Sequence, residues 1–182
     1  MSLAVRPSST ADLEHVLDYF LGASPEALRA MGVDPAKLPA RAEWSALLRA
    51  DEARPDEARE RIFVTWYLDQ VAIGHSSVNK IIFGKEAFIH LHMWSPELRK
   101  GGLGAELFRL SVAHFFERLR LERLWCEPYA ENPGPNRVLI RTGFELIKRY
   151  RTTPGAINFE QDVNQYKLER DRFIDTSARD RY

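Results

Sequence analysis

A strand–helix–strand unit in the middle of the chain constrains the fold more than any other feature of the sequence. Residues 87–94 are predicted to form a strand, and Pro96 ends it. Apolar residues at helical spacing then predict a long helix from about Gly102 to Leu119, and residues 121–127 predict the next strand. Two strands joined in this way lie parallel in one sheet, with a right-handed crossover. The rest of the fold must be built around this pair.

The other predicted strands come mainly in hairpins, which are antiparallel. Residues 62–68 and 71–79 flank a tight turn, and a second reversal at residues 80–86 leads into the central strand. The sequence therefore predicts an α/β (α+β) fold: a mixed, mostly antiparallel seven-stranded sheet flanked by helices. The remaining strands are expected at residues 3–6, 144–152 and 163–168. A helix is expected to start within Pro7–Thr10 and to stop at Gly22, others are expected at 42–54 and 133–141, and at most one short helix within 25–39.

Length and composition are those of one globular domain. The chain has 182 residues, 45% hydrophobic and 29% charged, and we expect a domain over residues 1–170 with a polar, frayed tail over 171–182. Its 26 basic and 26 acidic residues cancel, which argues against a nucleic-acid partner. The single cysteine, Cys126, excludes an internal disulfide, and we find neither a signal peptide nor an apolar run of about 20 residues. These features predict a cytoplasmic protein without a membrane partner.

The residues between the central strand and the long helix carry the chemical signal. The segment is Arg99-Lys100-Gly101-Gly102-Leu103-Gly104-Ala105. Its glycines allow backbone amides to approach a ligand closely. The first turn of a helix has unpaired N–H groups and a partial positive charge, to which the two basic side chains would add full charges. This arrangement favours a phosphate or a pyrophosphate as the ligand.

Three kinds of phosphate loop, and a glycine-rich turn without any ligand, could account for this segment. A P-loop needs Gly-x-x-x-x-Gly-Lys followed by Ser or Thr, which is absent. A dinucleotide fingerprint needs Gly-x-Gly-x-x-Gly, but Leu107 stands where the third glycine would be. The pattern Arg99-x-x-Gly102-x-Gly104-Ala105 resembles the pyrophosphate loop of the GNAT N-acetyltransferase superfamily.

A second segment resembles the RimJ/RimL-like branch of the same superfamily. Glu131-Asn132-Pro133 leads through Val138-Leu139 to Gly143-Phe144, where the family has an Asn that starts the last helix and a Gly-Phe that starts the next strand. With the segments around Pro7 and Pro96, the similarity spans about residues 3–168. It implies acetyl-coenzyme A as the cofactor and a small-molecule or peptide amine that attacks it directly in a ternary complex. The alternative is a coenzyme A-binding protein without transferase activity.

The resemblance also implies where the cofactor would bind. A backbone N–H near the end of the central strand, at Met93 or Trp94, would bind the thioester oxygen. The two strands flanking the long helix would splay there to admit the pantetheine arm, which Asn132 would face unless it simply caps its helix. The expected cofactor-binding residues are Met93, Trp94, Arg99, Lys100, Gly101, Gly102, Leu103, Gly104, Ala105, Asn132 and Asn136.

The sequence departs from the family where many members carry a proton donor for the leaving sulfur. Leu139 stands at the place of a Tyr, and Pro135 at the place of the Ser of the RimJ/RimL-like branch. Neither residue can donate a proton, so either another residue does so or coenzyme A leaves as an anion. Tyr129 is the nearest candidate in the sequence, and packing at the sheet edge is its alternative role.

Histidines are the candidate bases, because the amine must lose its proton before it attacks. His90 and His92 lie two residues apart on the central strand and so share a face. A tight turn between the neighbouring strands would put His75 opposite His92, and Ser77 opposite His90. Some members of the family place histidines on this strand as proton relays, and His90 matches that placement. A structural polar ladder and a three-histidine zinc site are the alternatives, although the resemblance implies no metal.

The loop between the last two strands is unusually apolar for a surface segment. It covers residues 153–159 and contains Ile157 and Phe159. Loops commonly carry specificity, and exposed apolar residues commonly mark contacts. This loop could therefore border the acceptor site or form the contact of a homodimer.

Overall fold

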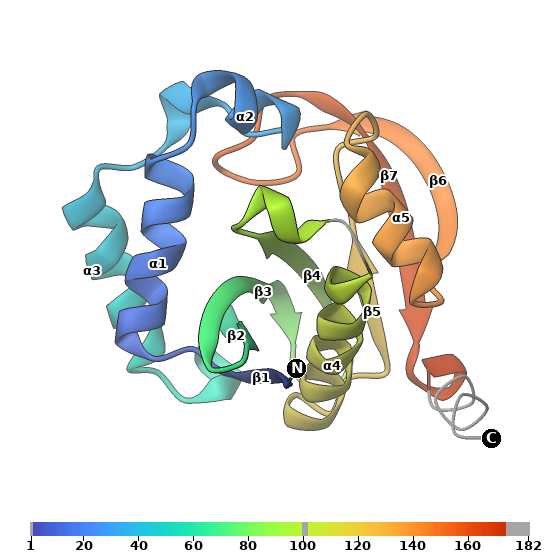
Figure 1. The fold of residues 1–182 in the computed structure, drawn as a ribbon. Helices are drawn as coiled ribbons and strands as arrows, with labels where there is room; N and C mark the ends of the chain where they lie inside the picture. Colours follow the sequence, from blue (N-terminus) through green and yellow to red (C-terminus); the bar gives the residue numbers. More distant parts are fainter. Residues whose placement is uncertain (1, 100–101, 174–182) are drawn as a thin grey trace.

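The computed structural model describes residues 2–99 and 102–173, and it places seven strands in one mixed sheet (Figure 1). The strand order is β1-β2-β3-β4-β5-β7-β6, with β4 and β5 parallel and the other neighbouring pairs antiparallel. This confirms the predicted fold class. The strands are β1 (Leu3–Pro7), β2 (Arg61–Leu68), β3 (Val71–Ile82), β4 (Glu86–Met93), β5 (Arg123–Cys126), β6 (Glu145–Thr152) and β7 (Gln161–Glu169). The α-helices are α1 (Thr10–Leu21), α2 (Pro25–Ala30), α3 (Arg41–Glu52), α4 (Leu103–Arg118) and α5 (Pro133–Arg141), and the short 3-10 helices are η1 (Pro35–Lys37), η2 (Asp56–Ala58) and η3 (Pro96–Arg99).

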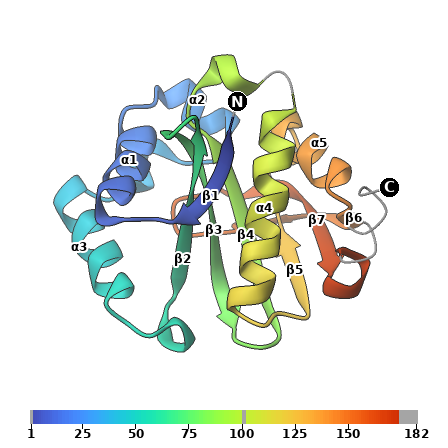
Figure 2. The same cartoon turned by 60° about the horizontal axis from the view of Figure 1, so that its bottom comes forward.

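Helices cover both faces of the sheet, with α4 on one face and α1 and α3 on the other (Figure 2). The alternation along β2 explains this division, because successive side chains of a strand point to opposite faces. Val64 and Trp66 pack in the core under α4, where Trp66 Nε1 donates a 2.8 Å hydrogen bond to Ser111 Oγ. Phe63 packs instead with residues of α1 and α3. No helix in the described part of the chain is long and apolar enough to cross a membrane.

Apart from the short helices η2 and η3 and shifts of one or two residues at the ends of elements, the structure differs from the sequence-based expectation in three places. Strand β3 continues to Ile82, past the expected end at residue 79, through an irregularity in its register. The stretch 25–39 forms η1 in addition to one short helix, α2. Phe173 is buried and packs against Phe116, with ring centroids 5.6 Å apart. The core therefore extends beyond the domain boundary that we expected at residue 170.

The loop between β6 and β7 is fastened to the segment that follows α2, beside which it runs in Figure 1. The Asp34 N–H donates to the Ile157 carbonyl oxygen at 2.8 Å. Asn158 Nδ2 and Gln161 Nε2 both donate to the Gly32 carbonyl oxygen, at 2.8 and 2.7 Å. Ile157 packs in the apolar cluster under α1 and α2. The apolar character of this loop is thus used within the chain, and Ile157 gives no support to a homodimer contact.

Candidate active site

The hydrogen-bond ladder between β4 and β5 is short and leaves one edge of β4 open. It ends at Phe88, so the last five residues of β4, Ile89–Met93, have no partner on β5. On its other edge β4 stays paired with β3, and the Trp94 N–H donates to the Ile73 carbonyl oxygen at 2.9 Å. Successive residues of a strand direct their backbone groups to opposite edges, so the Met93 N–H faces the open edge. The expected splay is present, and Met93, rather than Trp94, offers a backbone donor there.

The glycine loop leads directly into the N-terminus of α4. Gly102 is the N-cap residue with a φ of +88°, a conformation that favours glycine. Gly104 has no such need, because a Cβ there would find Met93 Cε as its nearest neighbour, at 3.8 Å. The protein therefore has room for a side chain at Gly104, and this open space lies at the positive end of the helix dipole. Lys100 and Gly101 lie outside the described residues.

Arg99 is hydrogen-bonded to the end of β4. Its Nη2 donates a 3.0 Å hydrogen bond to the Met93 carbonyl oxygen. Burial is the main cause of the lowered pKa of His92 and of the raised pKa of Tyr19, and the charge of Arg99 acts on both groups as a smaller effect. The guanidinium of Arg99 therefore lies at the open edge of β4, because the N–H and the carbonyl oxygen of Met93 face the same edge.

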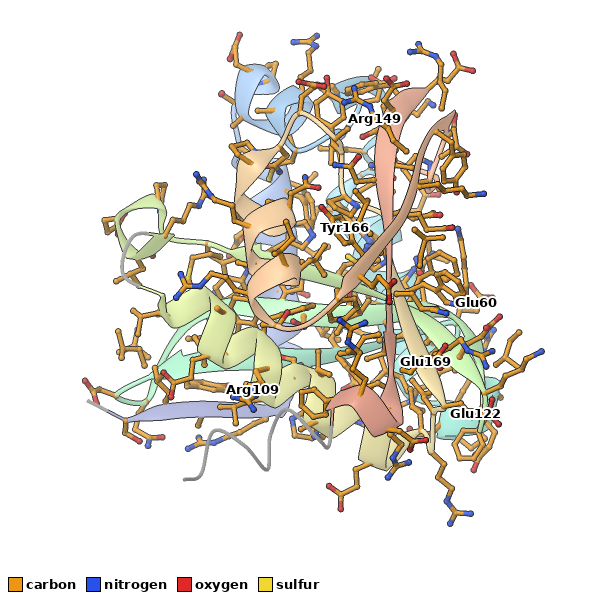
Figure 3. All side chains as sticks on the ribbon, turned by 90° about the vertical axis from the view of Figure 1, so that its right-hand side faces the viewer. Glu60, Arg109, Glu122, Arg149, Tyr166 and Glu169 are labelled. Carbon is orange, nitrogen blue, oxygen red and sulfur yellow. The ribbon has the colours of Figure 1, made fainter. Side chains whose placement is uncertain are left out.

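Asn132 begins α5 and leaves its side chain without a capping role. It is the N-cap residue, yet its side chain makes no capping hydrogen bond, so the simple capping alternative is wrong. Asn136, one turn later, is buried, and its Nδ2 donates to the carbonyl oxygens of Tyr129 and Asn132. Its Oδ1 accepts from Asn164 and from Tyr166, which lies on β7 beside α5 (Figure 3). Because these bonds are internal, Asn136 fixes the start of α5, and we correct its expected role as a cofactor ligand.

Three histidines cluster on the face of the sheet that α1 covers. The register pairs His75 with His92 and His90 with Ser77, as predicted. The rings of His75 and His92 are stacked, with centroids 4.8 Å apart and planes 18° apart. Tyr19 of α1 meets both rings edge to face, at 6.3 and 5.5 Å. The cluster therefore lies next to Met93 in sequence but on the side of the sheet away from α4.

Hydrogen bonds determine the tautomers of two of these histidines, His75 and His90. Trp94 Nε1 can only donate, and it donates to His75 Nδ1 at 2.9 Å, so His75 carries its proton on Nε2. His90 Nε2 lies 3.1 Å from Asn79 Oδ1, which can only accept, so His90 donates there and its Nδ1 is the basic nitrogen. Both N–H groups of Trp94 are thus used within the protein, and we correct its expected role as a thioester-oxygen donor.

Burial keeps the three imidazoles neutral. Together with nearby cations it lowers the pKa of His90 to about 4, and together with His90 and Arg99 it lowers the pKa of His92 to about 3. Burial also holds the pKa of His75 well below its usual value, and the two neighbouring histidines add to this. At neutral pH the cluster can accept protons, but each histidine is a weak base.

The cluster does not have the geometry of a zinc site. Stacked rings direct their nitrogens past each other, whereas the ligands of one metal ion must converge on a point. His75 Nδ1 is also occupied by Trp94. Among the residues that the structure describes, no group of three or more His, Cys, Asp or Glu side chains could hold a metal ion. The zinc alternative therefore has no support in the geometry.

Comparison with known families decides what this arrangement is. Residues 2–145 match the model of the acetyltransferase (GNAT) domain. The chain belongs to this family. It is therefore an N-acetyltransferase whose acetyl donor is acetyl-coenzyme A, as the sequence motifs implied. A comparison with curated proteins found no match.

Solved structures of GNAT proteins share the fold of this acetyltransferase. The ribosomal L7/L12 α-N-protein acetyltransferase RimL with coenzyme A is similar over 94% of this chain and 96% of its own, with 17% identity and a TM-score of 0.75. Spermidine N-acetyltransferase from Vibrio cholerae with coenzyme A and spermine is similar over 94% of this chain and 98% of its own, with 16% identity and a TM-score of 0.76. Aminoglycoside acetyltransferase AAC(6')-Ib with coenzyme A is similar over 97% of this chain and 99% of its own, with 15% identity and a TM-score of 0.73.

This GNAT acetyltransferase lacks a proton donor at both positions where the family pattern has one. Leu139 is completely buried in the core, and Pro135 lies in the first turn of α5. Tyr129 forms an isolated bridge with Val163, and its ring meets Phe159 edge to face at 5.7 Å. The structure thus gives Tyr129 a packing role and places its ring against the β6–β7 loop.

Sequence reasoning missed one cation of this acetyltransferase altogether. Arg141, in the last turn of α5, brings its Nη2 to 3.6 Å from the position of a Cβ on Gly102. A basic residue in the last turn of a helix is ordinarily explained by the helix dipole, so its position alone gives no further signal. Only the packing of α5 beside α4 reveals that it lies at the glycine loop.

Proposed function

We propose that this acetyltransferase acts on primary amines of peptides or small molecules, with α-amino groups ahead of lysine-like amines. The observation that carries the proposal is the open edge of β4 beside the glycine loop, with the Met93 N–H directed into the opening and neutral histidines nearby. The titles of the similar structures name a protein α-amine, spermidine and an aminoglycoside as acceptors of those enzymes. They support an amine acceptor here.

The cofactor would lie along the open edge and end at the glycine loop. The pantetheine arm would use the backbone groups that β4 leaves unpaired on that edge, and the Asn132 side chain would face it. The pyrophosphate would sit on the amides from Gly101 to Ala105, with Lys100 beside them. The Met93 N–H would donate to the thioester oxygen as it becomes an oxyanion.

The preference for α-amino groups follows from the cost of removing the proton. At pH 7 a lysine-like amine costs about 4.6 kcal/mol to deprotonate, and an α-amino group costs about 1 kcal/mol. Transfer to an imidazole with a pKa of about 3, as His92 has, is uphill by roughly 10 kcal/mol for the first and roughly 6.5 kcal/mol for the second. Weak neutral bases are therefore better matched to an acceptor of low pKa.

We assign different roles to the three histidines. His92 adjoins Met93 and lies closest to the thioester along the strand, so it is the first proton acceptor. His90 is three residues from Met93, about 10 Å along the strand, so it would act through water. His75 has its acceptor nitrogen occupied by Trp94, so it positions His92 by stacking.

The missing donor for the leaving group is compatible with transferase activity. A thiol with a pKa near 8.5 leaves as an anion at pH 7 at a cost of about 2 kcal/mol. The reaction can therefore proceed with coenzyme A leaving as the thiolate, without a proton donor. Tyr129 is the remaining candidate donor, and Tyr129→Phe tests it: a fall in turnover of about 10²-fold supports the role. Unchanged turnover leaves Tyr129 as a packing residue.

The proposal is tested by following free thiol released from acetyl-coenzyme A with a panel of amines. The panel pairs peptides with a free α-amine against the same peptides with a blocked α-amine and a free lysine, and adds polyamines and aminoglycosides. We expect thiol release that depends on the acceptor and is faster with the α-amines. His92→Gln should lower turnover by roughly 10²- to 10⁴-fold and His90→Gln by less, with partial recovery at high pH. His114→Gln, toward the far end of α4, is the control. Wild-type turnover in both variants would reduce the cluster to a structural ladder.

The cofactor loop has its own test. Gly104→Val puts a branched side chain into space that the protein leaves open, so the fold should persist. Affinity for acetyl-coenzyme A, measured by calorimetry, should fall at least 10-fold because the side chain occupies the place of the phosphate. Unchanged affinity in the folded variant would overturn the loop assignment.

A further inference from the structure

A cation from a different part of the chain lies beside the glycine loop at Gly102. Arg141 closes α5, and its Nη2 lies 3.6 Å from the position of a Cβ on Gly102. Gly102 is the N-cap of α4, so this guanidinium stands beside the positive end of that helix. Two positive groups at one place repel each other, and an anion between them would remove the repulsion.

The arginine that the motif itself supplies is engaged elsewhere. Arg99 Nη2 donates a 3.0 Å hydrogen bond to the Met93 carbonyl oxygen, at the open edge of β4. Its guanidinium is therefore bonded to the end of β4. Among the described residues, Arg141 is the cation that lies at the N-cap of α4.

Apart from the dipole of α5, the residues of that helix give no structural reason for the position of Arg141. Helix α5, with the sequence PGPNRVLIR, contains no acidic residue, and Arg141 is exposed. Other arginines of this chain are paired: Arg118 donates to both carboxylate oxygens of Asp56, and Arg149 pairs with Glu131 and Asp162. Arg141 differs from these in being placed beside a loop that the family uses for phosphate.

We propose that Arg141 binds a phosphate group of coenzyme A, an inference that rests on the proposed cofactor loop and adds a residue to it. Coenzyme A carries two kinds of phosphate, the pyrophosphate and the 3′-phosphate on the ribose. A guanidinium recognises either through two parallel N–H donors. The shared chemistry is a phosphate oxygen at the junction of α4 and α5, and the two sources are separated by experiment.

The experiment measures affinities of Arg141→Gln and Arg141→Lys for coenzyme A and for 3′-dephospho-coenzyme A by calorimetry. We expect Arg141→Gln to weaken binding of coenzyme A about 10-fold, the lower end of the range for a charged hydrogen bond because the site is exposed. Arg141→Lys should recover part of the loss, since it keeps the charge and loses the fork. A loss confined to coenzyme A assigns Arg141 to the 3′-phosphate, and an equal loss for both ligands assigns it to the pyrophosphate.

Controls separate this inference from the cofactor loop and from general charge effects. Arg120→Gln removes the same charge at the opposite end of α4 and should leave both affinities unchanged. Thermal unfolding without ligand checks that Arg141→Gln remains folded, because the arginine also favours the C-terminus of α5. Unchanged affinity in Arg141→Gln overturns the inference. If Gly104→Val still weakens binding in the same assay, the assignment of the cofactor loop is kept and only the role of Arg141 is rejected. If neither variant weakens binding, both assignments are wrong.

Discussion

The indole N–H of Trp94 donates a 2.9 Å hydrogen bond to Nδ1 of His75, and this single bond decides how the histidine cluster can work. An indole nitrogen has a hydrogen to give and no lone pair to accept with. His75 must therefore present a lone pair on Nδ1 and keep its proton on Nε2. Its protonation would turn Nδ1 into a second donor facing the indole N–H, so His75 stays neutral while it stacks on His92.

Replacement of Trp94 by Phe should release His75 from this state. The variant keeps an aromatic ring but leaves a buried acceptor without its donor, which costs about 1–3 kcal/mol of stability. We expect turnover to fall while affinity for acetyl-coenzyme A stays within about 2-fold of wild type, because Trp94 has no place on the open edge of β4. Nitrogen NMR of the imidazoles should show the Nε2–H tautomer of His75 in the wild type and a mixture in the variant.

The matched control for this change is Trp125→Phe. Trp125 also donates through its indole N–H, at 3.2 Å to Glu86 Oε2, but away from the histidines. The Trp125→Phe variant should be less stable than the wild type, but the nitrogen NMR signals of its imidazoles should be unchanged. An Nδ1–H tautomer of His75 in the wild-type protein would contradict the assignment.

Acid should destabilise this protein well above the pH at which carboxylates titrate. The pKa of His90 falls from 6.5 to about 4 on folding, and that of His92 to about 3. At a pH between the native-state pKa and 6.5, these histidines are protonated in the unfolded chain and neutral in the native state. Lowering the pH through this range therefore favours unfolding. Each such histidine contributes up to about 1.4 kcal/mol of lost stability per pH unit in that window, and nothing above it.

Denaturant unfolding at pH 7, 6 and 5 measures this dependence. His90→Gln should make the loss of stability with falling pH shallower by up to one proton. His15→Gln, which removes an exposed histidine of α1, should leave the slope as it is. Parallel slopes for wild type and His90→Gln would show that His90 does not resist protonation in the native state.

The fold was predictable from the sequence because its strongest signals are local. Hairpin turns and the strand–helix–strand unit specify which strands are neighbours, and the register of His75 against His92 follows from the turn between β3 and β4. The glycine pattern beginning at Arg99 similarly identifies the N-terminus of α4, since a helix start and its glycines are adjacent in the chain. These features need no knowledge of distant packing.

The roles of individual side chains were less predictable, because they depend on which way each one turns. Arg99 belongs to the phosphate motif yet bonds to Met93, and Arg141 reaches the same loop from a helix about 40 positions later. Trp94 was expected at the thioester oxygen, but the pairing with β3 directs its backbone N–H to Ile73. The register of His75 against His92 tells which residues lie opposite one another, but it does not by itself tell which of two successive N–H groups faces β3.

Asn132 offers a test that separates cofactor binding from helix capping. Its side chain makes no capping bond, so Asn132→Ala should change stability by less than about 0.5 kcal/mol, whereas loss of a true cap costs about 1 kcal/mol. Affinity for acetyl-coenzyme A should fall about 10-fold if the amide faces the pantetheine arm. Asn132→Ser, which can cap but has a shorter reach, should bind as weakly as the alanine variant. Wild-type affinity in Asn132→Ser would remove Asn132 from the cofactor site.

Gln161 should control the acceptor side of the site through the β6–β7 loop. Its side chain is 3% exposed, and its Nε2 donates to the carbonyl oxygens of Gly32 and Phe159, at 2.7 and 3.1 Å. Gln161→Ala leaves both oxygens without this donor and should cost about 1–3 kcal/mol of stability. If the loop borders the acceptor, KM for the amine should rise while affinity for acetyl-coenzyme A stays the same.

Gly32→Ala should act in the same way as Gln161→Ala, because a Cβ on Gly32 would stand 2.2 Å from Gln161 Oε1, and the φ of Gly32 is +82°. Since both changes break one contact, the double variant should lose less than the sum of the two. Arg151→Gln, an exposed change near the end of β6, is the control. An unchanged KM for the amine in a folded Gln161→Ala variant would show that the loop stabilises the fold without shaping the acceptor site.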